Sequence, residues 1–184
     1  MKKYIIFAGV NGAGKSTLYQ TNPQLFDMPR INVDEVVREF GNWKNAQDVM
    51  AAGKISVKRL KNYITEGVSF NQETTLCGKS IFQNIQLAKA TGYYIELYYV
   101  GVDSAEIAKK RVHQRVLAGG HGIPEQDIEK RYWESLNNLK VALPLCDLLV
   151  LYDNTDVFVK IADFENGICT RKVSKLPIWL KNVL

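Results

Sequence analysis

A chain of 184 residues, 46% of them hydrophobic and 23% charged, is long enough to bury a substantial core and suits one globular domain. The 24 lysines and arginines outnumber the 19 acidic residues, but they form no long run, which argues against nucleic acid as the main partner. Three cysteines without C-x-x-C spacing argue against a disulfide framework or a zinc site and favour reduced thiols.

The first predicted strand leads into a glycine-rich loop. Residues 3–8 are apolar and β-prone, and residues 9–16 fit the phosphate-binding pattern G-x-x-x-x-G-K-[ST]. Residues 16–20 predict a short helix that ends before Asn22-Pro23, because the residue before a proline disfavours the α conformation. Strand, glycine loop and helix in this order predict a phosphate-binding loop. The alternative is a glycine-rich turn that matches the pattern by chance.

This loop predicts the chemistry of its own residues. Glycines let the backbone turn its N–H groups inward as an anion-binding nest, and the helix N-terminus adds the positive end of its dipole. We expect Lys15 to reach the β- and γ-phosphates and the Ser16 hydroxyl to hold Mg²⁺. The nucleotide-binding residues predicted here are Gly9, Val10, Asn11, Gly12, Ala13, Gly14, Lys15, Ser16 and Thr17.

The middle of the chain alternates between strand-like and helix-like segments. In chain order these are strand 30–33, helix 34–40, helix 46–66, strand 68–73, helix 79–90 and strand 93–100. Gly67 and Gly92 are typical helix stops. The last strand is almost continuously apolar or aromatic, which is typical of a parallel strand buried on both faces.

The second half continues this alternation and then changes character. The predicted order is a helix capped by Asp103 or Ser104, a glycine-rich loop at 119–124, helix 125–142, strand 148–153, a hairpin at 157–173 and a closing helix at 177–184. The hairpin is predicted from the Asn166-Gly167 turn signal.

The alternation predicts the α/β class with a mainly parallel sheet. The expected architecture is a three-layer α/β/α P-loop NTPase fold with five strands in the sheet and the C-terminal hairpin in addition. We expect a single domain over residues 1–184. Residues 119–124 are predicted to be its lid loop.

Polar residues at the strand ends are candidates for the site, because ligands of such sheets bind beyond the carboxyl ends of the strands. Asp34 could accept the proton of a hydroxyl nucleophile, or it could only cap the helix that begins there. Glu73 could organise Mg²⁺ or the substrate, or it could be a solvated strand end. Thr75 could donate to substrate oxygens or cap the next helix.

Three arginines flank the predicted lid loop. Arg111 and Arg115 share one helix face, and Arg131 follows on the next helix. Arginines on both sides of a glycine-rich loop suit a lid that closes on ATP and neutralises the transferring phosphoryl group. The alternative is surface arginines that pair with Glu106 or Glu129.

The assembled motifs resemble those of the zeta-toxin family of P-loop kinases. The resemblance extends from the first strand to about Thr155, and it is most specific in the block of lid arginines with the Gly-Gly-His loop. The motifs that carry it are the phosphate loop, Ile31-Asn32-Val33-Asp34-Glu35, Glu73-Thr74-Thr75-Leu76, Arg111-Val112-x-x-Arg115-Val116, residues 119–124, Arg131-Tyr132 and Asp153-Asn154-Thr155.

The resemblance implies a reaction and a partner. Members of this family move the ATP γ-phosphate to the 3′-hydroxyl of the sugar in UDP-N-acetylglucosamine, and a small helical antitoxin blocks the ATP site. It implies ATP or GTP and Mg²⁺ as cofactors. Carried over by position, the catalytic residues are Lys15, Asp34, Arg115 and Arg131, the further ATP contacts are Arg111 and Asn154, and the substrate contacts are Asp34, Glu73 and Thr75.

The sequence departs from the family in its acceptor segment. Family toxins often have an acceptor-contacting arginine at the position of Cys77, and Lys79 could supply a charge there instead. A lysine is a point cation and not a bidentate fork, so the departure bears on the acceptor more than on the reaction. Two rival functions stay open: a polynucleotide or nucleoside kinase, and a nucleotide-dependent interaction module.

No segment approaches the length needed to span a membrane. Met1-Lys2-Lys3 followed by apolar residues resembles the start of a signal peptide, but the apolar run breaks at Asn11 without a cleavage pattern. Together with the reduced cysteines, this predicts a cytoplasmic location and no membrane partner.

Overall fold

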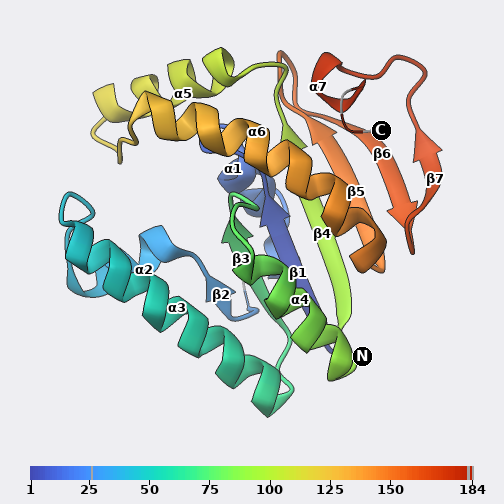
Figure 1. The fold of residues 1–184 in the computed structure, drawn as a ribbon, viewed down its shortest axis with the longest axis horizontal. Coiled ribbons are helices and arrows are strands. Elements are labelled where there is room, and N and C mark those ends of the chain that lie inside the picture. Colours follow the sequence, from blue (N-terminus) through green and yellow to red (C-terminus); the bar gives the residue numbers. More distant parts are fainter. Residues whose placement is uncertain (26, 182, 184) are drawn as a thin grey trace.

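A seven-stranded mixed sheet runs through the centre of the computed structural model, which describes residues 1–25, 27–181 and 183 (Figure 1). In spatial order the strands are β2 (Arg30–Ile31), β3 (Phe70–Thr74), β1 (Lys3–Ala8), β4 (Tyr94–Gly101), β5 (Leu148–Asp153), β6 (Val159–Glu165) and β7 (Ile168–Lys172). The first five are parallel to one another, and β6 and β7 are antiparallel.

The expectation of five strands is therefore wrong, although the α/β class and the parallel set of five are confirmed. The predicted hairpin is present, but β6 pairs with β5 and extends the same sheet. A physical reason is the open edge of β5, whose unpaired N–H and C=O groups can be satisfied by an added strand. The all-exposed β7 becomes the new edge.

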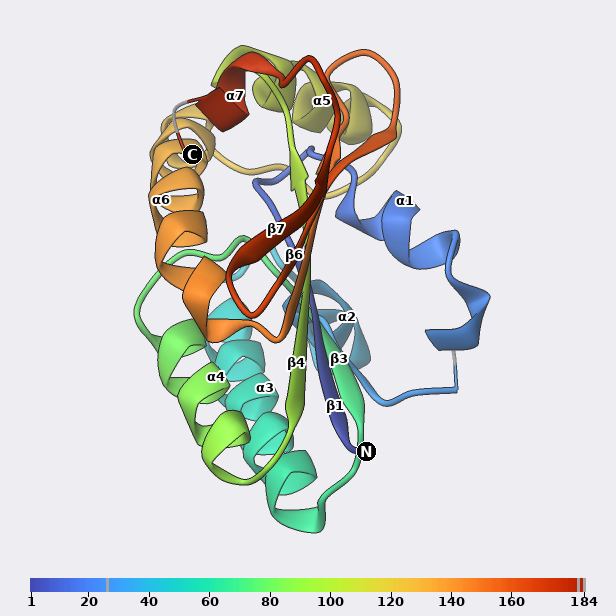
Figure 2. The same cartoon turned by 90° about the vertical axis from the view of Figure 1, so that its right-hand side faces the viewer.

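Helices cover both faces of this sheet. In chain order they are α1 (Lys15–Gln20), α2 (Val33–Phe40), α3 (Ala46–Glu66), α4 (Ser80–Ala90), α5 (Ala105–Leu117), α6 (Glu125–Ala142) and α7 (Ile178–Lys181), with short 3₁₀ turns at Pro23–Leu25 and Leu143–Leu145. Figure 2 shows α4 and α6 on one side of the sheet and α1 on the other. This is the expected three-layer arrangement. No described helix is long and apolar enough to cross a bilayer.

The arm made by α2 and α3 has its own small core. Val36, Val37 and Ala52 are buried against one another there, apart from the main cluster that surrounds the sheet. Helix α2 begins at Val33, one residue before the predicted boundary between strand 30–33 and helix 34–40. The side chain of Asn32 accepts a hydrogen bond from the Asp34 amide and caps the helix, which ends β2 at Ile31.

The C-terminal segment closes over the ends of β4 and β5. The indole of Trp179 packs on Gly101, where a Cβ atom would lie 2.3 Å from the ring. Its Nε1 donates to Asp153 Oδ1 at 2.8 Å, and its backbone N–H donates to Asp103 Oδ1 at 3.1 Å. The predicted helix 177–184 is shorter, at Ile178–Lys181, and residues 182 and 184 lie outside the described part.

Candidate active site

The loop after β1 has the backbone that the glycine pattern predicts. Gly9, Gly12 and Gly14 all have positive φ, at 140°, 82° and 108°. A Cβ atom on Gly12 would lie 2.7 Å from the carbonyl oxygen of Ala108, so α5 packs directly on the loop. Only glycine can adopt these backbone conformations without strain, so the shape of the loop depends on its three glycines. A chance glycine turn does not explain this fit.

Lys15 is buried at the centre of the loop. Its side chain is 7% exposed, and its Nζ donates to the Val10 carbonyl at 3.1 Å and lies 4.0 Å from Glu73 Oε1. Burial lowers the pKa of this lysine, while the nearby carboxylates of Glu73 and Asp34 act in the opposite direction. A cation held in this way is suited to a phosphate, which would supply the negative charge that burial makes favourable.

Glu73 faces the loop from the neighbouring strand. Parallel pairing of β1 with β3 sets Glu73 opposite Phe7, just before the loop begins. Its carboxylate is only 14% exposed, so it is not a solvated strand end. Both of its oxygens lie 3.4 Å from the Ser16 hydroxyl, and Oε2 accepts from Arg30 at 2.6 Å and from Asn32 at 3.2 Å.

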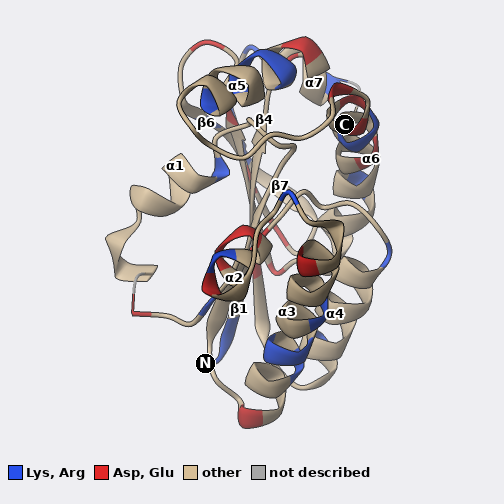
Figure 3. Ribbon diagram, turned by 90° about the vertical axis from the view of Figure 1, so that its left-hand side faces the viewer, with Lys and Arg blue, Asp and Glu red and all other residues tan. Residues whose placement is uncertain are grey.

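Asp34 is not the cap of its helix. Asn32 has that position, and Asp34 lies in the first turn of α2, where its own amide donates to the Asn32 side chain. The first turn also carries Glu35, and the last turn carries Arg38, so α2 is mixed in charge (Figure 3). The Asp34 carboxylate therefore has no capping role, and it lines two cavities.

Two cavities meet at these residues. The loop cavity, about 690 Å³, is lined by the phosphate loop, the start of α1 and the side chains of Arg30, Arg111 and Arg115. The α6 cavity, about 850 Å³, is lined by Thr75, Cys77, residues 121–124 and one face of α6. Residues common to both walls are Asn11, Lys15, Asn32, Asp34 and Glu73.

The predicted lid arginines lie around this junction but on different walls. Arg115 lines the loop cavity and donates through Nε and Nη2 to the His121 carbonyl, at 2.9 and 2.6 Å. Arg131 lines the α6 cavity and donates to Asn11 Oδ1 at 3.1 Å. Arg111 donates through Nη2 to the Thr155 carbonyl at 3.0 Å, while its buried Nη1 has no partner among the described residues.

The alternative for these arginines is wrong for the described residues. Lys109, and none of the three arginines, pairs with Glu106 at 3.6 Å and with Glu129 at 2.6 Å. The guanidinium groups remain beside the loop. An arginine with an unpaired buried nitrogen on a cavity wall is suited to an anionic ligand.

The other predicted residues are only partly brought together. Asn154 supports the loop from behind, because its Nδ2 donates to the Ala13 carbonyl at 2.8 Å. Gly9, Val10 and Ala13 belong to the loop but are not among the residues that line the loop cavity. Lys79 is exposed at the start of α4 and lines neither cavity.

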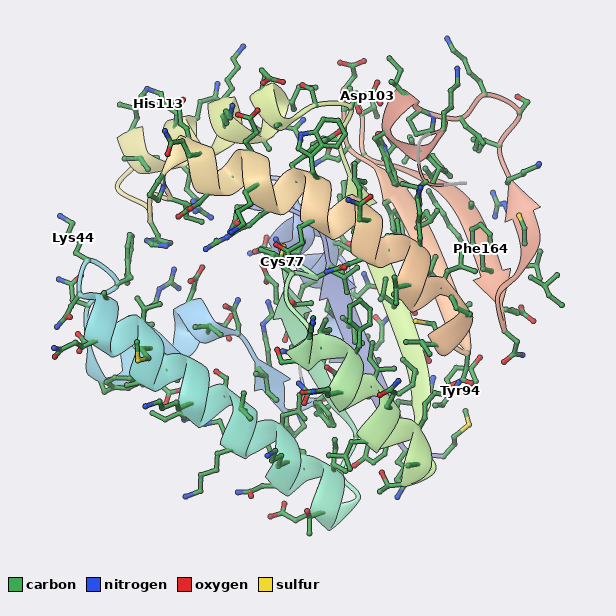
Figure 4. All side chains as sticks on the ribbon, in the orientation of Figure 1. Lys44, Cys77, Tyr94, Asp103, His113 and Phe164 are labelled. Atoms are coloured by element: carbon green, nitrogen blue, oxygen red, sulfur yellow. The ribbon has the colours of Figure 1, made fainter. Side chains whose placement is uncertain are left out.

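Cys77 lies on the wall of the α6 cavity, near α6 (Figure 4). Its Sγ is 3.6 Å from the backbone oxygens of Thr75 and Arg131, and burial raises the pKa of its thiol. The next residue, Gly78, donates its amide to Glu134 at 2.8 Å. All three cysteines of the chain are free thiols, as predicted.

Sequence reasoning missed three residues of the site. Arg30 and Asn32 hold Glu73, and Trp43 lines the α6 cavity and contacts His121 with ring centroids 4.1 Å apart. The signal for Arg30 and Asn32 is their place beside the Asp34 motif. Their partner is more than 40 residues away, so local spacing does not reveal the contact.

The donor set fits a magnesium ion. The Ser16 hydroxyl and the Glu73 carboxylate are hard oxygen donors that face each other at 3.4 Å, beside the cavity that the phosphate loop lines. Mg²⁺ prefers such donors, takes few of them from the protein, and completes its shell with phosphate and water. A metal site made only of protein side chains is a different case: within residues 1–25, 27–181 and 183, no three or more His, Cys, Asp or Glu residues cluster so that they could hold a metal.

A protein-family model described as an AAA domain, AAA_33, matches residues 5–132, well over half of the chain. The chain belongs to the AAA_33 family. The matched segment of this AAA_33 protein contains the phosphate loop, Asp34, Glu73, Arg115 and Arg131. An uncharacterised protein of Haemophilus influenzae is 33% identical to it over 130 residues, which cover 71% of this chain and 92% of that protein.

Solved structures share the fold. The AvrRxo1-ORF1:-ORF2 crystal structure with ATP superposes with a TM-score of 0.70 at 16% identity, covering 92% of this chain and 60% of that one. The AAA_33 chain thus spans about 60% of the length of that relative. The PezAT chromosomal toxin–antitoxin system of Streptococcus pneumoniae gives a TM-score of 0.61 at 18% identity, covering 86% and 71%. These TM-scores show a common P-loop kinase-like fold, and at such low identity they show the fold alone.

Proposed function

We propose that this AAA_33 protein is a phosphotransferase that moves the γ-phosphate of ATP, or GTP, to a hydroxyl group of a small molecule. One observation carries the proposal: Lys15, Asp34 and Glu73 lie on the common wall of two cavities. The loop cavity is suited to the donor and the α6 cavity to the acceptor. Transfer would take place at the junction. The ATP present in the AvrRxo1 crystal structure is consistent with this assignment of the donor.

In the proposed reaction the acceptor oxygen attacks the γ-phosphorus and the bond to the departing ADP oxygen breaks. Asp34 accepts the proton of the attacking hydroxyl, which its place between the cavities allows. Lys15, Arg115 and Arg131 offset the negative charge of the phosphoryl group. A Mg²⁺ ion held by Ser16 and Glu73 would supply electrostatic stabilisation of the nucleotide phosphates.

For the acceptor we propose a nucleotide sugar such as UDP-N-acetylglucosamine. The motifs shared with zeta toxins support this choice, and in this reading Thr75 contacts the acceptor, which would have to extend beyond the α6 cavity to reach Lys79. A volume of about 850 Å³ lies within the range of small-molecule sites. A toxin role would bring a small helical antitoxin as partner, and the PezAT structure shows that a toxin–antitoxin protein shares the fold. Free thiols and ATP use favour the cytoplasm.

A labelled-phosphate assay tests the function. We expect purified protein with γ-labelled ATP and magnesium to label at least one member of a nucleotide-sugar panel. Asp34→Ala should lower kcat by about 10²–10⁴ with little change in ADP affinity, because it removes only the proton acceptor. The exposed Asp156→Ala is the matched control. Equal labelling by wild type and Asp34→Ala, or none by either, would count against the proposal.

A second candidate is a polynucleotide or nucleoside kinase, favoured by the excess of basic residues. Adding a single-stranded oligonucleotide with a free 5′-hydroxyl to the same assay separates the two, because the first proposal expects no label on it. An interaction module would instead bind ATP tightly and transfer nothing.

A further inference from the structure

Arg30 is a charged side chain of the loop cavity that several neighbours hold in place. It is 11% exposed, and its three nitrogens donate to Glu73 Oε2 at 2.6 Å, Asn71 Oδ1 at 3.1 Å and Glu35 Oε1 at 3.1 Å. Its guanidinium also lies over the ring of Tyr19, 3.7 Å from the centroid. Contacts with β3, α1 and α2 therefore hold its position.

The carboxylate of Glu73 stands between two cations. Its Oε2 lies 2.6 Å from the Arg30 guanidinium and also accepts from Asn32, whereas Oε1 lies 4.0 Å from the Lys15 ammonium. Coulomb attraction falls with distance, and an arginine fork fixes the direction of its hydrogen bonds. Glu73 is thus bound to Arg30 and only near Lys15.

We propose that Arg30 is a positioning residue that keeps the Glu73 carboxylate from pairing with Lys15, so that the lysine stays available for phosphate. The inference rests on the proposed nucleotide site. A glutamate free to rotate toward Lys15 would neutralise the one cation at the centre of the loop and compete with the nucleotide for it. Arg30 prevents this by holding Glu73 from the opposite side.

Binding of ADP in EDTA tests the proposal without any phosphoryl transfer and without a metal. Arg30→Met keeps an unbranched apolar stem but removes the guanidinium fork, so Glu73 should turn to Lys15 and the Kd for ADP should rise about 10-fold. Adding Glu73→Gln should restore the Kd to within about 3-fold of wild type, since a neutral amide does not compete for the lysine. Arg30→Lys should lie between, because it keeps the charge and loses the fork.

Arg59→Met is the matched control. Arg59 also pairs with a glutamate, since two of its nitrogens donate to Glu39 at 2.8 and 2.5 Å, and Arg59 lines neither cavity. Its loss should leave the Kd unchanged. If Arg30 were only structural, Arg30→Met/Glu73→Gln would bind ADP as weakly as Arg30→Met or more weakly, and that result would overturn the proposal alone. Wild-type protein that binds no ADP would overturn the proposed function, and this inference with it.

Discussion

At the scale of single residues, Lys15 and its surroundings set the chemistry of the site. The buried ammonium group of Lys15 lies beside the carboxylate of Glu73, which is paired with Arg30. Lys15 and Glu73 both lie on the wall shared by the two cavities. Burial makes the charged form of this lysine unfavourable until an anion arrives. A bound phosphate would therefore stabilise the charged form of Lys15, which burial makes unfavourable.

This gives a prediction for pH. Lys15 binds phosphate only when protonated, and its lowered pKa means that it loses its proton as pH rises toward 10.5, earlier than an exposed lysine would. The affinity for ADP should therefore fall on the alkaline side with a midpoint below 10.5. We expect Lys15→Arg to bind with no such fall, because a guanidinium stays protonated to above pH 12. Titrations of a fluorescent ADP analogue between pH 7 and 10.5 check this; a flat wild-type profile would contradict it.

Individual residues also show how far sequence reasoning reaches. Lys15, Asp34 and Glu73 were predictable, since a motif or a strand end marks each of them and the parallel sheet brings strand ends together. Arg30, Asn32 and Trp43 were not predictable, because their roles come from contacts across the fold. The roles themselves remain predictions, including the substrate contact at Lys79, which lies outside both cavities.

At the scale of elements, the phosphate loop is held by the packing of α5 on its backbone. Gly12→Ala should therefore destabilise the protein by about 1–3 kcal/mol and weaken ADP binding, because φ is 82° and the new Cβ would meet the Ala108 carbonyl. Gly53→Ala, in the middle of α3 with open space around it, is the matched control and should stabilise by up to about 1 kcal/mol. Urea denaturation and ADP titration of both variants measure the difference; equal stability would show that the contact with α5 yields easily.

Element boundaries were predicted well where a chemical stop is present and poorly where pairing decides. Gly67 ends α3 in the left-handed conformation, as its place in the sequence indicates. The hairpin was predicted from Asn166-Gly167, but which strand it would pair with was not, since β-turn chemistry says nothing about the edge that a hairpin joins.

At the scale of the whole molecule, α7 fastens the far end of the chain onto the sheet. Trp179→Ala should reduce the free energy of unfolding by about 3–5 kcal/mol, because it empties a buried site over Gly101 and leaves Asp153 without the indole donor. Trp133→Ala, at a tryptophan that is 53% exposed, should cost about 1 kcal/mol or less. Guanidinium denaturation curves check both, and similar losses would contradict the role given to α7.

The order of the contacts along the sequence also determines when the phosphate loop of a newly made chain is fully supported. The first strand and its loop are synthesised long before the residues that support them. The Lys3 amide donates to the hydroxyl of Ser69, 66 positions further on, and the Asn154 side chain donates to the Ala13 carbonyl, 141 positions back. At about 5–20 residues per second, the nascent loop waits roughly 7–28 s for its last support. Nucleotide binding should thus require synthesis to have passed Asn154, and shorter fragments should lack this support of the loop.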